Sequence, residues 1–327
     1  SFIIKEGMPA NQTVFFKVVM EDGDYNSWRV LRVKINDFDA GYVNLEENNI
    51  QFSVGASGKL GFNGPTNDQT IGHGVKYKNG DNILFKMGLL ATLNDVQASF
   101  VLDGDYESIS KIDSETNIEA DKVAYSYYND EPAGSNKIGL QIKQKSMVWL
   151  DDDRMDFIIF EMNIKNTSGS EINGLNFGVF SDWDIANLNE NYAVYDSTIK
   201  TGYTYSSGGT YAGIHVISEG NVQNYAFDNG GANGSISQAD GFSSAEQHTS
   251  ISGGILRDSA GLGDVSNTIG VGDLNIGVDD SIKVAFALVV GDNYNVLKEA
   301  ALESDTAYYE LYNLASEVVL NDSSSCN

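Results

Sequence analysis

Short runs of β-branched and aromatic residues, separated by clusters of turn-forming residues, recur along most of this chain. Such runs are typical of strands, because these side chains pack well on a pleated surface. The clusters between them, such as Asp228–Gly234, are rich in Gly, Asn and Asp, which tolerate the positive φ angles of tight turns. The sequence therefore predicts an all-β fold, an antiparallel β-sandwich with long loops. The strand-like runs are Val14–Met20, Trp28–Ile35, Ile50–Val54, Ile83–Leu90, Phe157–Ile164, Tyr211–Ile217 and Ile282–Val290.

Helical patterns occur in two places. Ser243 and Ser244 open one short segment, where their hydroxyls are suited to cap the free amides of a first helical turn. Over Tyr294–Ala315, apolar residues return at helical spacing, which predicts a short C-terminal helix packed on the sheet. No repeat of fixed period is evident, which argues against a propeller or a solenoid.

The N-terminal segment, residues 1–40, is predicted to be separate from a large domain over residues 41–327. Val14–Met20 and Trp28–Ile35 flank a Glu-Asp-Gly-Asp turn, and Asn36–Gly41 has the character of a linker. Two strands cannot bury an adequate core by themselves. The pair therefore either completes a neighbouring sandwich or packs on the main body, and the sequence leaves both arrangements open.

The balance of charge excludes two classes of partner. The chain carries 20 Lys and Arg against 46 Asp and Glu, a net charge of −26. Nucleic acids and anionic lipid surfaces are not expected partners, because both are bound through clustered cations. No hydrophobic run is long enough to span a bilayer, so we expect no membrane insertion. An acidic surface attracts cations, calcium included, although a merely well-solvated surface explains the same charge.

Two features of the chain ends bear on its origin. The chain begins at Ser1 without a Met, so we expect it to be a processed or excised piece of a longer protein. Its single cysteine, Cys326, has no partner for a disulfide within the chain.

The strongest candidate site follows the strand-like runs Phe157–Ile164 and Leu175–Phe180. In a strand, Asp182 and Asp184 project to one side and Trp183 to the other. Hard cations prefer several oxygen ligands, and oxygen-bearing side chains follow closely, so the sequence predicts a calcium site. The alternative is that these side chains bond to local backbone amides in Asx turns. The predicted ligands are Asp182, Asp184, Asn187, Asn189 and Asp196.

Catalytic groups are sparse. His73, His215 and His248 are scattered and are interpreted as ordinary core, loop or surface residues, and with a single cysteine they do not favour a zinc site. Among paired carboxylates, Asp103 with Asp105 and the run Asp151–Asp153 with Asp156 are typical of turns. A glycosidase that uses Asp182 and Asp184 stays open as a third function, since two carboxylates are enough for that chemistry.

Tyrosines suggest a binding function. Exposed rings on a sheet can stack on sugars or on a protein partner. Tyr suits partly hydrated surfaces, because it has an apolar ring and a polar hydroxyl. Tyr203 and Tyr205 occupy alternate positions of one run, although aromatic residues at such positions are commonly core.

Several segments occur in the same order in a known family. The chain resembles the β-rich region downstream of the catalytic domain in large secreted subtilisin-like serine peptidases of bacteria, many of them exported by type IX secretion. The opening run Asn11–Asn36 resembles the last hairpin of the Ig-like domain that precedes that region. The segments that carry the resemblance are Asn48–Pro65, Ile71–Ala91, Ile138–Trp149, Asp156–Tyr205, Asp240–Gln247, Gly263–Leu274 and Val284–Asn293.

The resemblance implies a non-catalytic accessory region. The parent peptidases carry Asp-Thr-Gly, His-Gly-Thr and Gly-Thr-Ser motifs around their triad, and none of the three occurs here. The expected location is therefore the secreted fraction or the cell surface. The expected partners are the catalytic domain of the same precursor, or a surface protein or polysaccharide. The alternative function is a carbohydrate-binding or adhesive cell-surface module.

Overall fold

The computed structural model describes the backbone of residues 13–22, 25–34, 41–64, 69–117 and 119–322. Side chains are described over 41–64, 69–117 and 119–312. The chain divides into two compact units, Ser1–Ala40 and Gly41–Asn327. Most of the predicted linker, residues 36–40, and the predicted free cysteine, Cys326, lie outside the described residues.

The first unit contains a hairpin of two long strands. β1 (Thr13–Asp22) pairs antiparallel with β2 (Tyr25–Lys34), from Thr13 opposite Lys34 to Asp22 opposite Tyr25. The pairing brings together the two strand-like runs of this segment. Its assignment to an Ig-like domain stays a prediction.

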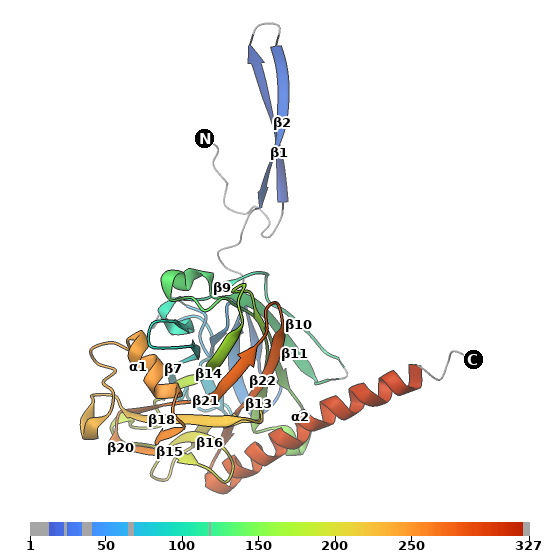
Figure 1. Ribbon diagram of the computed structural model, residues 1–327. Helices are drawn as coiled ribbons and strands as arrows, with labels where there is room; N and C mark the ends of the chain where they lie inside the picture. The colour runs from blue at the N-terminus through green and yellow to red at the C-terminus, as the bar shows by residue number, and fades with distance from the viewer. Residues whose placement is uncertain (1–12, 23–24, 35–40, 65–68, 118, 323–327) are drawn as a thin grey trace. The chain divides into compact units, whose positions relative to one another are not determined.

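The second unit is built from two ten-stranded sheets, which confirms the all-β sandwich (Figure 1). We call them the β13 sheet and the β14 sheet. The β13 sheet has the order β10 (Asp113–Glu115), β11 (Lys122–Asn129), β12 (Leu140–Val148), β13 (Phe157–Asn166), β22 (Ser281–Gly291), β17 (Tyr211–Val216), β16 (Thr201–Ser206), β15 (Asn191–Asp196), β20 (Ser259–Gly263), with β9 (Glu107–Ser108) beside β11. The β14 sheet has the order β19 (Ile255–Arg257), β18 (Asn221–Asp228), β21 (Val265–Ile276), β14 (Ile172–Trp183), β7 (Leu84–Thr92), β5 (Lys59–Leu60), β4 (Ile50–Gly55), β3 (Tyr42–Leu45), with β6 (Val75–Tyr77) beside β4 and β8 (Ala98–Phe100) beside β7.

Aromatic rings join the two sheets in the interior. Phe52 of β4 meets Phe160 of β13 with ring centroids 5.6 Å apart, and Phe177 of β14 stacks on Phe286 of β22 at 6.4 Å. All four side chains are almost fully buried. Apart from the parallel pair of β18 and β19, the described strand pairs of both sheets are antiparallel. The core therefore lies between the sheets, as a sandwich requires.

Two α-helices cover outer faces of the sandwich. α1 (Ser244–Ile251) begins with a capping box in which Ser243 and Glu246 satisfy each other's backbone amides, so the predicted serine cap is present. Five 3₁₀ turns complete the element order: η1 (Val101–Asp103), η2 (Glu131–Asn136), η3 (Asp152–Arg154), η4 (Leu188–Glu190) and η5 (Ala232–Gly234). Within the described residues, no helix combines the length and apolar character that crossing a bilayer requires.

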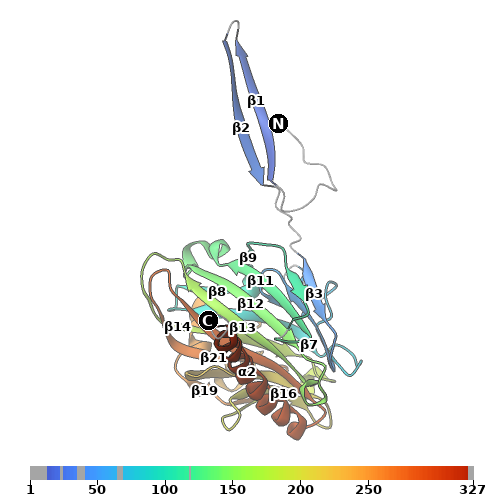
Figure 2. The same ribbon diagram turned by 90° about the vertical axis from the view of Figure 1, so that its right-hand side faces the viewer.

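α2 (Tyr294–Asp322) starts where the C-terminal helix was predicted and continues past the predicted end at Ala315. It lies across the outer face of β22 and β13 (Figure 2). Polar contacts fasten it there: His215 of β17 faces Asp305, with Nε2 3.0 Å from Oδ1, and Tyr308 donates a hydrogen bond to buried Glu161. The contacts of α2 with this sheet lie mainly on β22, β13 and β17, so part of the outer face of the β13 sheet remains uncovered by the helix.

One buried carboxylate ties the two sheets together at a loop. Asp130 is 1 % exposed and accepts four hydrogen bonds, from the Ser99 hydroxyl and from the amides of Ile138, Gly139 and Leu140. Ser99 belongs to β8 in the β14 sheet, whereas Leu140 starts β12 in the β13 sheet. Because ionised acceptors form strong hydrogen bonds, this residue holds the 130–140 loop in place.

Candidate functional site

Asp182, the first predicted calcium ligand, lies at the end of β14 and is 4 % exposed. It stands opposite Lys86 of β7, with Lys86 Nζ 3.9 Å from Oδ2. The Asn229 side-chain amide donates to Oδ1 over 3.3 Å. Burial raises the pKa of Asp182 to about 7; Lys86 opposes this shift, and the nearby charges of Asp264 and Asp184 add to it. A carboxyl in such a setting readily becomes neutral.

Asp184 lies close enough to Asp182 to share its electrostatic environment. It is half-buried, and burial followed by the charge of Asp264 raises its pKa. Trp183, between the two carboxylates, is 1 % exposed, and its indole donates to the Ser181 hydroxyl over 3.0 Å. The carboxylates of Asp184 and Asp264 thus lie close enough to Asp182 for their charges to raise its pKa. The indole ring of Trp183 is packed in the interior.

Two of the other predicted ligands, Asn187 and Asp196, accept hydrogen bonds from nearby backbone amides. Asn187 accepts from the amide of Asn189, which caps η4. Asp196 accepts from the amide and hydroxyl of Thr198 and from the hydroxyl of Tyr294. Asx-turn contacts, the alternative weighed from the sequence, are therefore present at Asn187 and Asp196. Among the described side chains, no three His, Cys, Asp or Glu residues are grouped to hold a metal ion, so a calcium site here stays a prediction.

A row of three tyrosines crosses the uncovered part of the β13 sheet. Tyr192 of β15 lies opposite Tyr205 of β16, which lies opposite Tyr211 of β17. The rings of Tyr205 and Tyr211 are parallel within 1° at 4.8 Å between centroids, and those of Tyr192 and Tyr205 are stacked at 5.3 Å. All three residues are partly exposed. We call Tyr192, Tyr205 and Tyr211 the tyrosine row.

The hydroxyl groups are the second feature of the tyrosine row. Among the described residues, none of the three hydroxyls has a hydrogen-bond partner. Burial, followed by the neighbouring tyrosines Tyr211 and Tyr192, raises the pKa of Tyr205, so its hydroxyl stays protonated and available as a donor. The row therefore combines an apolar flank with a line of hydrogen-bonding groups.

Tyr203, which the sequence singled out together with Tyr205, has a different role. It is 8 % exposed and contacts Tyr294 at the start of α2 with centroids 5.9 Å apart. Opposite it stands Gly213, where a Cβ atom would lie only 2.6 Å from the Cβ of Tyr203. Tyr203 lies on the same face as the row, and its ring packs beside those of Tyr205 and Tyr211, with centroids 6.1 Å and 6.0 Å away. Tyr192 and Tyr211 were missed because their alignment depends on strand register, which no local pattern reveals.

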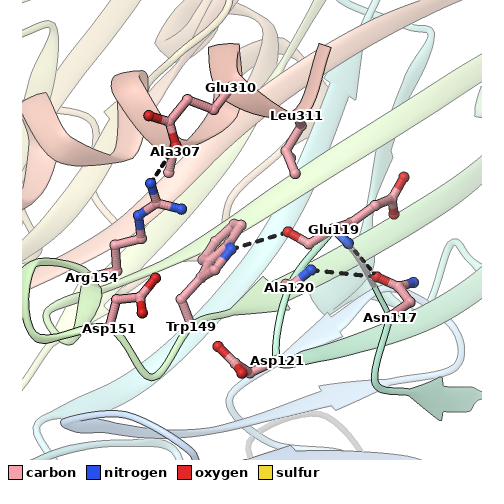
Figure 3. A pocket seen from close by; sticks show the side chains of 10 residues that line it. All are labelled: Asn117, Glu119, Ala120, Asp121, Trp149, Asp151, Arg154, Ala307, Glu310 and Leu311. Carbon is pink, nitrogen blue, oxygen red and sulfur yellow. Dashed lines mark hydrogen bonds and ion pairs between the residues drawn. The ribbon is translucent and has the colours of Figure 1, made fainter. Parts of the chain in front are cut away.

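A surface pocket of about 240 Å³ lies between α2 and the β12–β13 turn (Figure 3). Trp149 forms its floor, and its indole donates to the Glu119 carbonyl over 3.1 Å. Arg154 pairs with Glu310 of α2 and lies over the Trp149 ring. Because Arg154 already occupies the exposed side of the aromatic ring, little of it is left for a ligand.

The three histidines lie apart. His73 pairs with Glu46, and His248 faces the Thr92 hydroxyl. His215 contacts both Thr201 and Asp305, a hydroxyl–imidazole–carboxylate sequence. However, Thr201 and His215 are fully buried, and the Thr201 hydroxyl donates to the Ile199 carbonyl over 2.7 Å. The hydroxyl is therefore not placed to attack a substrate.

The remaining acidic pairs have structural contacts. Asp103 in η1 accepts from Gln247 of α1, and Asp105 accepts from the amide of Phe100. Asp156 accepts from Asn49 and Tyr77. Burial raises the pKa of both Asp103 and Asp105. These contacts connect loops to neighbouring elements, as expected for turn residues.

Comparisons with known proteins concern the fold. No protein-family model and no curated protein matches this chain. Among solved structures, it is similar to a bacterial glucoamylase complexed with acarbose, with 11 % identity and a TM-score of 0.52 over 84 % of this chain and 35 % of that chain. The chain thus spans about a third of that enzyme's length.

Two further structures are more distant. The Slr1438 protein from Synechocystis sp. PCC 6803 has 8 % identity and a TM-score of 0.41 over 77 % of this chain and 96 % of that chain. Heparan sulfate lyase HepC from Pedobacter heparinus has 10 % identity and a TM-score of 0.40 over 78 % of this chain and 36 % of that chain. At these identities a likeness concerns architecture, and function must be argued from the site.

Proposed function

We propose that the unit Gly41–Asn327 is a non-catalytic module that binds a carbohydrate polymer through the tyrosine row. One observation carries the proposal: three stacked, partly exposed tyrosines present hydroxyls that have no partner among the described residues. A sugar has apolar C–H patches and many hydroxyls. Tyr suits both, because it offers apolar surface and a hydrogen-bonding group.

The shape of the row favours a polymer over a small molecule. Small ligands are usually enclosed in concave pockets, whereas the row extends across three neighbouring strands of an outer face. The net charge of −26 disfavours sulfated or uronic acid polymers. We therefore assign a neutral polysaccharide as the ligand class.

Binding to neutral polysaccharides tests the proposal. The protein is incubated with insoluble glucans, mannans, xylan and chitin, and soluble fragments of any polymer that retains it are titrated by calorimetry. Tyr205→Ala is expected to weaken binding by about tenfold, because it removes the middle ring and both stacking contacts. Tyr205→Phe keeps the ring and removes only the hydroxyl, so it distinguishes the contribution of the hydrogen bond from that of ring stacking.

The matched control is Tyr309→Ala, which removes a tyrosine that is 50 % exposed on α2, outside the row. Its affinity is expected to equal that of the unmodified protein. Equal losses in the two alanine variants, or no retention by any polymer, would contradict the assignment of the row.

The second proposal concerns context: the chain is an accessory region of a secreted, subtilisin-like serine peptidase of the cell surface. The ordered segments that resemble that family support it, and so does the absence of the three triad motifs. A peptidase domain encoded in the same precursor is expected to bind the purified chain, and the chain alone is expected not to cleave casein. Cleavage that a serine-directed inhibitor abolishes would refute the non-catalytic assignment.

A further inference from the structure

The tyrosine row is closed at the end that faces α2. Gly291 of β22 lies opposite Tyr211, so it occupies the next position along the row. A Cβ atom at this glycine would lie 2.5 Å from the backbone nitrogen of Leu297, in the first turn of α2, and 3.0 Å from the Asn293 carbonyl oxygen. Val289, the next outward residue of β22, belongs to the same apolar cluster as Leu297. Backbone therefore fills the space over Gly291, as only glycine permits, and the row cannot continue beyond Tyr211.

The opposite end of the row is open. Gly261 of β20 lies opposite Tyr192 and is partly exposed, so the position that continues the row there carries no side chain. Ser259, two residues earlier, lies opposite Val194 and is also small. β20 is the edge strand of the β13 sheet. A polymer that lies along the row can therefore pass over Gly261 and leave the protein at the edge of the sheet.

Aromatic rings gather at the closed end. Tyr203 lies beside Tyr211 with ring centroids 6.0 Å apart, and Tyr294, the first residue of α2, lies beside Tyr203 at 5.9 Å. The hydroxyl of Tyr294 donates to Asp196, which holds this ring in place. Tyr211 and Tyr294 are both partly exposed. The closed end thus offers apolar surface from the sheet and from the helix.

A free donor stands at the closed end. The side-chain oxygen of Asn293 accepts from the amides of Asn295 and Val296 over 3.0 Å and 3.2 Å, so it caps the first turn of α2. This contact directs the other half of the group, its NH₂, away from the helix. Among the described residues, none accepts a hydrogen bond from this NH₂ group, and Asn293 is exposed. The group is therefore available to donate to a ligand.

The end of a polysaccharide chain fits this arrangement better than its interior does. An internal sugar is linked on both sides, so its chain continues in both directions along the row, and α2 blocks one of them. A terminal sugar lacks that continuation and carries a free hydroxyl in its place. The NH₂ group of Asn293 suits such a hydroxyl, because an amide can donate to its oxygen.

We propose that the tyrosine row binds the end of a polysaccharide chain, with the terminal sugar between Tyr211 and Asn293. The sugars that follow lie on Tyr205 and Tyr192, and the rest of the chain leaves over Gly261. This inference rests on the proposed function, because it needs the row to bind carbohydrate. It gives the site a direction, and it makes the number of chain ends the quantity that limits binding.

Chain ends can be added without changing the mass of the polymer. Soluble unbranched glucan, mannan and xylan are each offered to the full chain intact and after limited acid hydrolysis, at equal mass. Calorimetry gives the number of binding sites per gram of polymer. Doubling the number of chain ends is expected to double the number of binding sites, whereas sites along the interior of a chain would stay constant in number.

Asn293→Asp tests the donor. Asp caps a helix as well as Asn does, so α2 keeps its first turn, whereas the NH₂ group is replaced by an oxygen that cannot donate. The affinity for trisaccharides of the polymer that binds is expected to fall by about fivefold, as the loss of one hydrogen bond implies. Asn295→Asp is the matched control, because it makes the same change at an exposed residue of the same helical turn, and its affinity is expected to be unchanged.

Two results would overturn this inference and leave the proposed function standing. One is binding whose number of sites per gram does not change after hydrolysis. The other is an equal affinity of Asn293→Asp and Asn295→Asp for the trisaccharides. Absence of binding to every polymer would instead refute the proposed function itself. The count of sites uses the unmodified chain, so it decides the inference even if a variant does not fold.

Discussion

Replacing Asp130 by Asn tests whether one buried carboxylate holds the two sheets together at the 130–140 loop. Three donors meet Oδ2, the Ser99 hydroxyl and the amides of Ile138 and Gly139, whereas the Leu140 amide meets Oδ1 over 2.7 Å. An Asn in the same pose keeps most contacts by placing its carbonyl oxygen at Oδ2. Its NH₂ group then opposes the Leu140 amide.

The expected loss in the free energy of unfolding follows from these contacts. A buried amide left without its partner costs about 1–3 kcal/mol. The three remaining hydrogen bonds lose their charge assistance, and ionised acceptors form bonds roughly twice as strong as neutral ones. We expect Asp130→Asn to lower the free energy of unfolding by about 3–5 kcal/mol.

Urea denaturation followed by tryptophan fluorescence measures the change. Asp151→Asn is the matched control, because Asp151 is exposed and its side chain has no partner among the described residues. The control is expected to stay within about 0.5 kcal/mol of the unmodified protein. A loss below about 1 kcal/mol in Asp130→Asn would show that the four hydrogen bonds do not stabilise the fold as argued.

Two further predictions concern the tyrosine row and the acidic cluster. Gly213→Ala places a Cβ 2.6 Å from that of Tyr203. We expect thermal unfolding to show a loss of about 1–3 kcal/mol in the free energy of unfolding, and we expect polysaccharide binding to weaken. The control variant Gly230→Ala meets open space and is expected to leave binding unchanged. The pKa of Asp184 is raised in the folded protein, so this carboxyl keeps its proton to a higher pH in the folded than in the unfolded chain. The stability that this difference provides at acid pH is lost as the pH rises through the pKa of the folded state. Asp184→Asn does not titrate, so its melting temperature relative to the unmodified protein is expected to rise between about pH 4 and pH 8; a difference that is constant with pH would refute this sign.

Local chemistry was enough to locate the main elements. The run Phe157–Ile164 lies within β13, and Ile282–Val290 lies within β22. The C-terminal helix starts at Tyr294 as its apolar spacing indicated, although its end lies beyond Ala315. Strand patterns and capping residues act on near neighbours in sequence, so they can be recognised before the fold is known.

The candidate sites needed the folded chain. Asp182 was recognised as unusual from its neighbours Trp183 and Asp184, but its partners Lys86 and Asn229 are remote in sequence. Likewise Tyr205 was singled out while the residues that flank it across the strands were not. Sheet order and register bring these groups together, and they depend on how whole strands bury their faces against the opposite sheet, a property that no short window of sequence contains.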